Sequence, residues 1–193
     1  GITTSGWLID KVPFPPVDRC EVSIDGATPE IHDKVRGLEG SWQRAVDAVK
    51  SIKKHCRVSQ INFTLQADNY HEVVDFCKLA KELGAPASII PISLKLSAQE
   101  KLADEMNEYD LPKLKELIDE AYKVGNVITP RHVLDTFLKK VEHGPCNQPC
   151  MTTYNGILIF ADGNLYPCGN LDLPLGNLNF RTQLKDIYKN SRN

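Results

Sequence analysis

Three cysteines near the C-terminal end of the chain are its best candidate metal ligands. Cys146 and Cys150 are separated by three residues in "CNQPC", and Cys168 ends the segment "NLYPC". A hairpin over residues 154–168 would fold Cys168 back beside Cys150, because its two strands run antiparallel. Thiolates are soft ligands that favour iron–sulfur clusters and zinc. The spacing therefore predicts a three-thiol metal site whose fourth ligand is a further cysteine, a substrate atom or His143.

Spacing alone leaves other roles open for these thiols. A Cys3His zinc site would use His143 as its fourth ligand, a disulfide would join two thiols, and simple burial would leave them unrelated. Six cysteines in 193 residues are too sparse for a disulfide scaffold. Cys20, Cys56 and Cys77 occur singly and are interpreted as small buried side chains. A reducing, cytoplasmic setting fits this usage.

A second candidate site lies where two predicted strands end. Residues 20–25 and 61–66 alternate polar and apolar side chains, whereas a parallel strand covered on both faces is almost continuously apolar. The alternation predicts a barrel that surrounds a polar cavity; edge strands with one solvated face are the alternative. Ligands of such folds bind at the carboxyl ends of strands. Ser23, Asp25 and Gln66 are therefore candidate binding residues.

Strand-like and helix-like patterns alternate along most of the chain. Strands are predicted over 20–25, 58–66 and 87–93, and helices over 41–52, 69–84, 114–124 and 130–141. Ser41 and the pair Asn69 and Glu72 are the expected helix caps, and Pro130 is expected at the first position of its helix. Repeated strand–helix units predict an α/β fold with a parallel sheet.

The pattern changes after Gly144. Two short strands joined through Asp162-Gly163, a hairpin turn signal, precede a short amphipathic helix over 183–190. The predicted domains are 1–125, a linking helix over 126–143, and a small α+β module over 144–193 that carries the cysteine cluster.

Composition narrows the function classes. The chain is 41% hydrophobic and 25% charged, which is enough apolar material for a core. Its net charge of -2 and pI near 6.2 argue against a nucleic-acid or anionic-membrane partner. No apolar run approaches the roughly 18 residues that a membrane-spanning helix needs. The start at Gly1, without a methionine, favours a piece of a longer polypeptide.

Two segments resemble radical S-adenosylmethionine (SAM) enzymes. The segment "CEVSIDGATPEIHDKVRGLEGSWQRAVDAV" is similar to the middle of these proteins, which carry an S-[IL]-D-G…H-D…R…G-S pattern on a barrel strand and its following helix. The tail, with twelve residues between Cys150 and Gly163 and four more before Cys168, is similar to the first half of a SPASM or twitch domain. Such domains hold auxiliary iron–sulfur clusters.

The resemblance implies a partial (β/α)6 barrel whose interior holds SAM and substrate. It implies that Ser23 and Asp25 lie near the ribose and methionine of SAM. Arg36 matches a position that could pair with the SAM carboxylate, although a solvated arginine at a helix end is the alternative.

In the tail, the resemblance implies that Cys150 and Cys168 are ligands of an auxiliary 4Fe–4S cluster, with Cys146 as a third ligand. The C-x3-C-x2-C loop that holds the family's SAM-binding 4Fe–4S cluster does not occur in this chain. SAM and this second cluster are therefore expected only with a preceding segment, and the chain alone is expected to be inactive.

The resulting hypothesis is an oxidoreductase or maturase that generates a 5′-deoxyadenosyl radical from SAM. Its expected substrate is a peptide or protein side chain, or else a small molecule, and its expected electron donor is a protein such as flavodoxin or ferredoxin. The alternative is a non-catalytic zinc-binding α/β module that mediates interactions.

Overall fold

The computed structural model describes residues 1–9, 11, 15–93, 104–144, 157–171, 173–178, 184–185 and 187. These residues divide between two compact units. The first unit comprises Gly1–Ile92 and Glu105–Gly144, and the second comprises Ser93–Asp104 and Pro145–Asn193. Residues 126–143, predicted as a linking helix, lie within the first unit.

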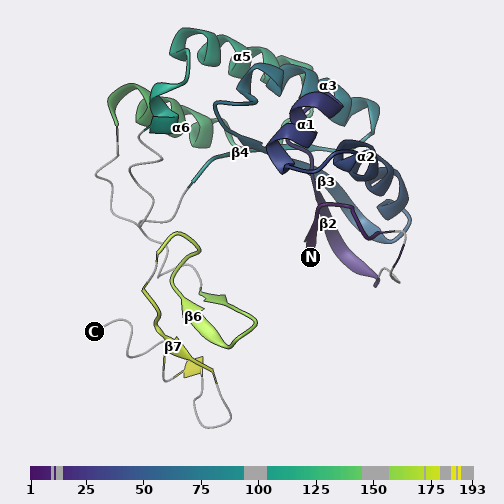
Figure 1. The fold of residues 1–193 in the computed structure, drawn as a ribbon, viewed down its shortest axis with the longest axis vertical. Helices are drawn as coiled ribbons and strands as arrows, with labels where there is room; N and C mark the ends of the chain where they lie inside the picture. The colour runs from purple at the N-terminus through teal and green to yellow at the C-terminus, as the bar shows by residue number, and fades with distance from the viewer. Residues whose placement is uncertain are drawn as a thin grey trace. The chain divides into compact units, whose positions relative to one another are not determined.

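The first unit contains a four-stranded parallel sheet in the order β1-β2-β3-β4 (Figure 1). The strands are β1 (Ile2–Thr4), β2 (Val17–Ser23), β3 (Cys56–Leu65) and β4 (Ala87–Pro91). This arrangement confirms the predicted α/β fold with a parallel sheet. The three predicted strands are present, and β1 is a further, short strand at the N-terminal end of the chain.

The sheet register puts the apolar positions of neighbouring strands on one face. Val22 pairs with Ile61, and Phe63 pairs with Ile89. All four side chains are fully buried, and the Phe63 ring packs on the ring of Phe76 with their centroids 4.7 Å apart. Because successive side chains point to opposite faces of a strand, the intervening polar residues lie together on the other face.

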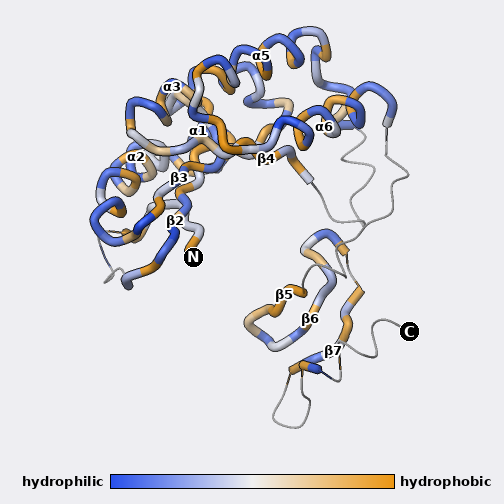
Figure 2. Tube along the Cα trace, turned by 180° about the vertical axis from the view of Figure 1, so that it is seen from behind, coloured by the Kyte–Doolittle hydropathy of each residue, from blue (hydrophilic) through white to orange (hydrophobic). Residues whose placement is uncertain are grey.

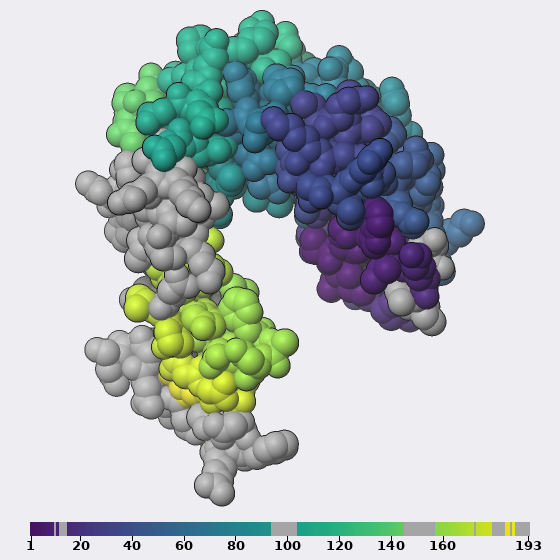
Figure 3. All heavy atoms as spheres, in the orientation of Figure 1, coloured from purple at the N-terminus to yellow at the C-terminus, as the bar shows by residue number. Residues whose placement is uncertain are grey.

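Amphipathic helices cover the apolar face of the sheet, with their hydrophilic sides turned away from it (Figure 2). In this unit they are α1 (Pro29–Arg36), α2 (Ser41–Ile52), a 3-10 turn η1 (Tyr70–Glu72), α3 (Val73–Glu82), α5 (Leu111–Val124) and α6 (Arg131–His143). Helix α2 packs on β2 and β3, and α3 packs on β3 and β4. Figure 3 shows the heavy atoms of these elements as spheres, coloured from purple at the N-terminus through blue to teal at α5.

The predicted cap of α2 is wrong. Ser41 is the first residue of the helix and does not cap it with its own side chain. The cap is Asp33 of α1, whose carboxylate accepts hydrogen bonds from the Gly40 N–H, the Ser41 hydroxyl and the Trp42 N–H at 2.6, 2.8 and 2.8 Å. Burial opposes the ionisation of Asp33, but these three hydrogen bonds outweigh it and lower the pKa of the carboxyl.

The predicted capping box of Asn69 and Glu72 is also wrong. Asn69 precedes η1 without capping it through its side chain. Its Oδ1 instead accepts from the Gln66 N–H at 2.9 Å, and its Nδ2 donates to the carbonyls of Asp25 and Thr64 at 3.0 and 2.9 Å. Asn69 and Glu72 therefore form hydrogen bonds with the loops near the ends of β2 and β3 and do not cap their own helix.

Helix α6 begins one residue later than predicted. Pro130 precedes it with ψ at 135°, an extended value that keeps the proline outside the helix. Just before it, Val127 forms a parallel bridge with Ala87. The Thr129 hydroxyl then accepts from the Ile89 N–H at 2.7 Å and donates to the Ile89 carbonyl at 2.9 Å. Thr129 thus completes the hydrogen bonding of β4 on its outer side.

The second unit contains an antiparallel sheet in the order β5-β6-β7. Its strands are β5 (Leu158–Ile159), β6 (Asn164–Tyr166) and β7 (Gly176–Asn177). The predicted hairpin is confirmed, with Gly163 at a φ of 83° that favours glycine. Of the helix predicted over 183–190, residues 184, 185 and 187 are described, and all three are helical.

Candidate functional site

The predicted binding residues of the first unit lie at the carboxyl edge of the sheet. Ser23 is the last residue of β2, and Gln66 directly follows β3. Asp25 lies two residues beyond the end of β2, and its Oδ1 accepts a hydrogen bond from the Thr64 N–H of β3 at 2.8 Å. The structure therefore links Asp25 directly to the end of the neighbouring strand.

Asp25 forms an ion pair with Arg36, the last residue of α1. The Arg36 Nη2 lies 2.7 Å from the Asp25 Oδ2, and the Asp25 side chain is only 4% exposed. Both Asp25 oxygens are thus engaged by protein groups, as a buried carboxylate requires. The Arg36 side chain keeps 30% of its surface exposed, and a guanidinium has five N–H donors. Arg36 is therefore held in place by Asp25 and still has donors for a ligand.

A buried histidine holds the backbone at Asp25. The His32 Nδ1 accepts a hydrogen bond from the Asp25 N–H at 2.9 Å. Burial lowers the pKa of His32 first, and the charge of Arg36 lowers it further. A neutral imidazole has one nitrogen without a proton, so His32 is in the form that can accept this hydrogen bond.

The next residue of this loop has room only for glycine. A Cβ added at Gly26 would lie 2.5 Å from the His32 backbone nitrogen. The Gly26 carbonyl in turn accepts a hydrogen bond from the Trp42 Nε1 at 3.2 Å. The loop after β2 is therefore packed tightly against both α1 and α2.

Two predicted binding residues keep free polar groups at this edge. Within the described part of the chain, the Ser23 hydroxyl and the Gln66 side-chain amide have no hydrogen-bond partner, and both residues are half-buried. A hydroxyl and an amide can each donate and accept. They are available to a ligand with hydroxyl or amino groups, while Asp25 and Arg36 form the fixed ionic part of the edge.

The polar face of β2 and β3, which lies opposite the apolar face that the helices cover, carries a chain of polar contacts. The Gln60 Nε2 donates to the Asn62 Oδ1 at 3.1 Å, and the Asn62 Nδ2 donates to the Glu21 Oε2 at 2.8 Å. The Thr3 hydroxyl also donates to the Glu21 Oε2, at 3.3 Å. The polar face predicted from the alternation is therefore present and internally hydrogen-bonded, while the enclosing barrel remains a prediction.

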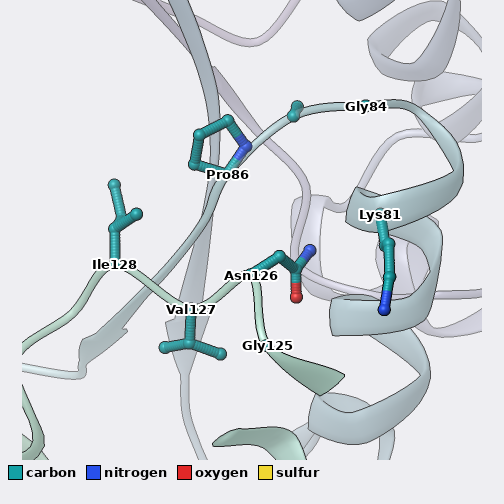
Figure 4. Close-up of a pocket in the computed structure, with 8 residues that line it drawn as sticks. Lys81, Gly84, Pro86, Gly125, Asn126, Val127 and Ile128 are labelled. Carbon is teal, nitrogen blue, oxygen red and sulfur yellow. The ribbon is translucent and has the colours of Figure 1, made fainter. Parts of the chain in front are cut away.

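A pocket of about 350 Å³ lies at the other, amino edge of the sheet, at the start of β4 (Figure 4). Among its lining residues, Lys81 donates through Nζ to the Val124 carbonyl at 3.0 Å, and Asn126 donates through Nδ2 to the Cys77 carbonyl at 2.9 Å. The Asn126 Oδ1 is buried and, among the described residues, without a partner. These side chains join α3 to the C-terminal end of α5 and the residues after it, so the pocket belongs to the packing of the fold.

The cysteine cluster falls mostly outside the described residues. Cys146 and Cys150 lie there, while Cys168 is a half-buried free thiol just beyond β6. The His143 side chain is 72% exposed, with its Nε2 3.9 Å from Glu142. Across the described ranges, no group of three or more His, Cys, Asp or Glu side chains could hold a metal ion. The three-thiol site and its fourth ligand therefore remain predictions.

Of the other three cysteines, two are buried as the sequence indicated, and Cys56 is less buried than predicted. Cys20 and Cys77 are fully buried. Burial raises the pKa of Cys20 to about 11 and that of Cys77 to about 12, so both stay as unreactive thiols at neutral pH. Cys56 is half-buried and donates from Sγ to the Ile52 carbonyl at 3.3 Å.

None of the helices in the described part of the chain is long and apolar enough to cross a bilayer.

The chain is similar to proteins that use SAM (AdoMet). No protein-family model matches it. It is 28% identical over 192 residues to an AdoMet-dependent heme synthase of Oleidesulfovibrio alaskensis, covering 91% of this chain and 49% of that protein. It is 24% identical over 200 residues to a second AdoMet-dependent heme synthase, from Methanosarcina barkeri, covering 95% of this chain and 57% of that protein. The chain thus spans about half the length of the curated relatives it matches.

Solved structures share the fold. The chain matches native anSMEcpe with bound AdoMet at a TM-score of 0.55 and 22% identity, over 90% of this chain and 51% of that one. It matches native anSMEcpe with bound AdoMet and Kp18Cys peptide at a TM-score of 0.54 and 21% identity, over 97% of this chain and 54% of that one.

The resemblance to radical SAM enzymes that the sequence predicted is confirmed by these matches. The curated relatives that it matches in sequence are AdoMet-dependent heme synthases.

Sequence reasoning missed several residues that build the edge. Glu72 was predicted to cap its own helix rather than to bind the loop after β2, and no role of their own was predicted for Asp33 and Glu105. An acidic residue in or near a helix is common in any sequence, and its position in the chain does not indicate a distant hydrogen-bond partner.

Proposed function

We propose that the protein containing this chain is a radical SAM enzyme and that the carboxyl edge of its parallel sheet binds SAM. The main support is the similarity to AdoMet-dependent heme synthases over more than nine tenths of the chain. The free groups of Ser23 and Gln66 beside the Asp25–Arg36 ion pair add a donor set that suits SAM. SAM, when bound and reduced through an iron–sulfur cluster, supplies a radical that abstracts hydrogen from a substrate.

Each edge residue has a proposed role. The Ser23 hydroxyl and the Gln66 amide bind ribose hydroxyls or the amino group, since both side chains can donate and accept. Arg36 binds the SAM carboxylate through its remaining N–H donors. Asp25 has both oxygens engaged by Thr64 and Arg36, so its role is to hold the Arg36 guanidinium in the binding orientation.

We propose that Cys146, Cys150 and Cys168 hold an auxiliary 4Fe–4S cluster in the second unit. Cys168 fits this role because its thiol is free, half-buried and at the end of a hairpin strand. The SAM-binding 4Fe–4S cluster would be supplied by a C-x3-C-x2-C loop elsewhere in the intact protein. The electron donor is a low-potential protein such as flavodoxin or ferredoxin, in the cytoplasm.

Two substrate classes have support. A peptide or protein side chain is supported by the anSMEcpe structure with a bound Kp18Cys peptide, which has the same fold as this chain. A precursor of heme is supported by the sequence relatives, three of which are AdoMet-dependent heme synthases. Because the heme synthases match in sequence over nearly the whole chain, the heme precursor is the first substrate to test.

The test is SAM cleavage by the intact protein, purified without oxygen and reduced with dithionite. We expect formation of 5′-deoxyadenosine, and we expect Arg36→Met to weaken SAM binding about tenfold, as the loss of one charge-assisted hydrogen bond would. Lys34→Met is the matched control, because Lys34 is an exposed cation of the same helix paired with the exposed Asp68. Absence of SAM binding, or equal effects of the two variants, would contradict the proposal.

A further inference from the structure

Two carboxylates hold the backbone of the loops that follow β2 and β3. The first belongs to Glu72, which is only 9% exposed. Its Oε2 accepts hydrogen bonds from the Ala27 N–H at 2.7 Å and the Thr28 N–H at 3.4 Å, and its Oε1 accepts one from the Thr28 hydroxyl at 2.7 Å. Both Glu72 oxygens are therefore used by the loop that contains Asp25.

The second carboxylate belongs to Glu105. Its Oε1 accepts hydrogen bonds from the Ala67 N–H at 2.5 Å and the Tyr109 hydroxyl at 3.2 Å. Burial, followed by the charge of Glu105, raises the pKa of Tyr109, so the phenol keeps its proton and donates it to this hydrogen bond. Tyr109 is 8% exposed, and its ring centroid lies 5.4 Å from that of Tyr70 and 5.6 Å from that of Phe137. Glu105 is thus oriented by a tyrosine that is itself fixed by packing.

The two carboxylates are arranged in the same way. Each comes from the segment that follows one strand, and each contacts the loop that follows the neighbouring, preceding strand. Glu72 lies after β3 and contacts the loop after β2, whereas Glu105 lies after β4 and contacts the residue that follows Gln66. On the other side of Gln66, the Leu65 carbonyl accepts from the Ile92 N–H at 2.9 Å. The backbone on both sides of Gln66 is therefore held by the β4 connection.

From this arrangement we infer that Glu72 and Glu105 are positioning residues for SAM binding, an inference that rests on the function proposed above. They fix the loops that carry Asp25 and Gln66 without touching the ligand themselves. Loops held in the binding conformation lose less entropy when a ligand binds. An ionised acceptor holds an amide about twice as strongly as a neutral one. A purely structural role would lower stability but leave the SAM affinity of the folded protein unchanged.

The experiment compares Glu72→Gln and Glu105→Gln with Glu82→Gln in the intact protein. Glu82 is an exposed carboxylate at the end of α3, so its variant makes the same charge change away from the loops. SAM dissociation constants are measured by equilibrium dialysis, and local opening is measured by hydrogen exchange. For Glu72→Gln we expect about tenfold weaker SAM binding, because one amide oxygen cannot replace two carboxylate oxygens.

For Glu105→Gln we expect a smaller loss, about threefold, because a single oxygen can still accept both hydrogen bonds but without charge. The rate of amide hydrogen exchange should rise at residues 27–28 in Glu72→Gln and at residues 66–68 in Glu105→Gln. Exchange rates in the sheet itself should stay unchanged. Thr28→Val removes one donor to Glu72 at an exposed residue. It gives a milder test of the same contact if Glu72→Gln does not fold.

The outcomes separate the two proposals. If the unaltered protein does not bind SAM, the proposed function fails, whatever the exchange data show. If it binds SAM and the variants open their loops but keep normal SAM affinity, the positioning role is wrong and the carboxylates are structural. If exchange in both loops stays unchanged, the carboxylates do not hold them and the inference also fails.

Discussion

His32 is a buried titratable residue within the candidate SAM-binding edge. Its Nδ1 accepts the Asp25 N–H, and burial lowers the pKa of the imidazole below its usual value of 6.5. The charged groups around it are Arg36, which lowers this pKa further, and Asp25 and Asp33, which oppose the shift. Protonation would place a positive charge in a buried site and remove the acceptor of the Asp25 N–H.

The free energy of unfolding should therefore depend on pH through His32. The unfolded chain takes up this proton near pH 6.5, whereas the folded chain does so only at lower pH. Stability should be highest above pH 6.5 and decrease as the pH falls below it. In His32→Asn, whose Oδ1 can replace the Nδ1 acceptor, this part of the decrease should disappear. Urea unfolding between pH 7.5 and 5.5 measures the free energy of unfolding of both proteins. If that free energy depends on pH equally in both, His32 is not the residue responsible.

At the same scale, Asp33 shows how an acidic residue can act far from its own helix. The apolar spacing predicted α2 correctly, because periodicity depends on local positions. The cap of α2 could not be predicted in this way, since its carboxylate comes from α1 and reaches the Trp42 N–H nine residues further on. Ser41 had the right residue type for a cap but lies inside the helix.

At the scale of elements, Thr129 protects the outer edge of β4. An edge strand exposes unpaired N–H and carbonyl groups, and the Thr129 hydroxyl satisfies both groups of Ile89. Thr129 is 9% exposed, so water cannot easily replace it. At Ile89, the Thr129 hydroxyl thus makes the two hydrogen bonds that a neighbouring strand would otherwise make.

Thr129→Val should lower the free energy of unfolding by about 2 kcal/mol, because it keeps the shape of the side chain but leaves two shielded backbone groups unsatisfied. Thr136→Val is the matched control. The Thr136 hydroxyl is exposed on α6 and donates to the His132 carbonyl, so its loss should change stability by less than about 0.5 kcal/mol. Urea denaturation measures both variants, and a loss equal to that of the control would show that the β4 edge does not depend on Thr129.

At the scale of the whole molecule, the central question is what the second unit binds. Cys168 follows a hairpin strand that the sequence predicted, and its thiol is free. Iron–sulfur clusters and zinc both use thiolate ligands. Metal analysis of the intact protein therefore distinguishes the auxiliary cluster from the zinc-binding module.

Cys168→Ala should reduce the iron of the anaerobically purified protein by about four atoms and reduce its acid-labile sulfide equally, as loss of one 4Fe–4S cluster requires. Cys56→Ala is the control, because Cys56 is half-buried in the first unit and bonds to a helix carbonyl. It should leave iron and sulfide unchanged. Zinc in place of iron, lost in Cys168→Ala, would instead support the alternative module.

The sequence predicted strands β2, β3 and β4, helices α2, α3, α5 and α6, the hairpin after Gly144 and the resemblance to radical SAM enzymes. These depend on periodicity and short motifs, which act between residues close in the chain. Folding is needed to pair Arg36 with Asp25 and to bring Glu72 and Glu105 to amides 45 and 38 residues away. The reason is physical: a carboxylate bonds to whichever donors the fold brings within about 3 Å, and local spacing does not contain that information.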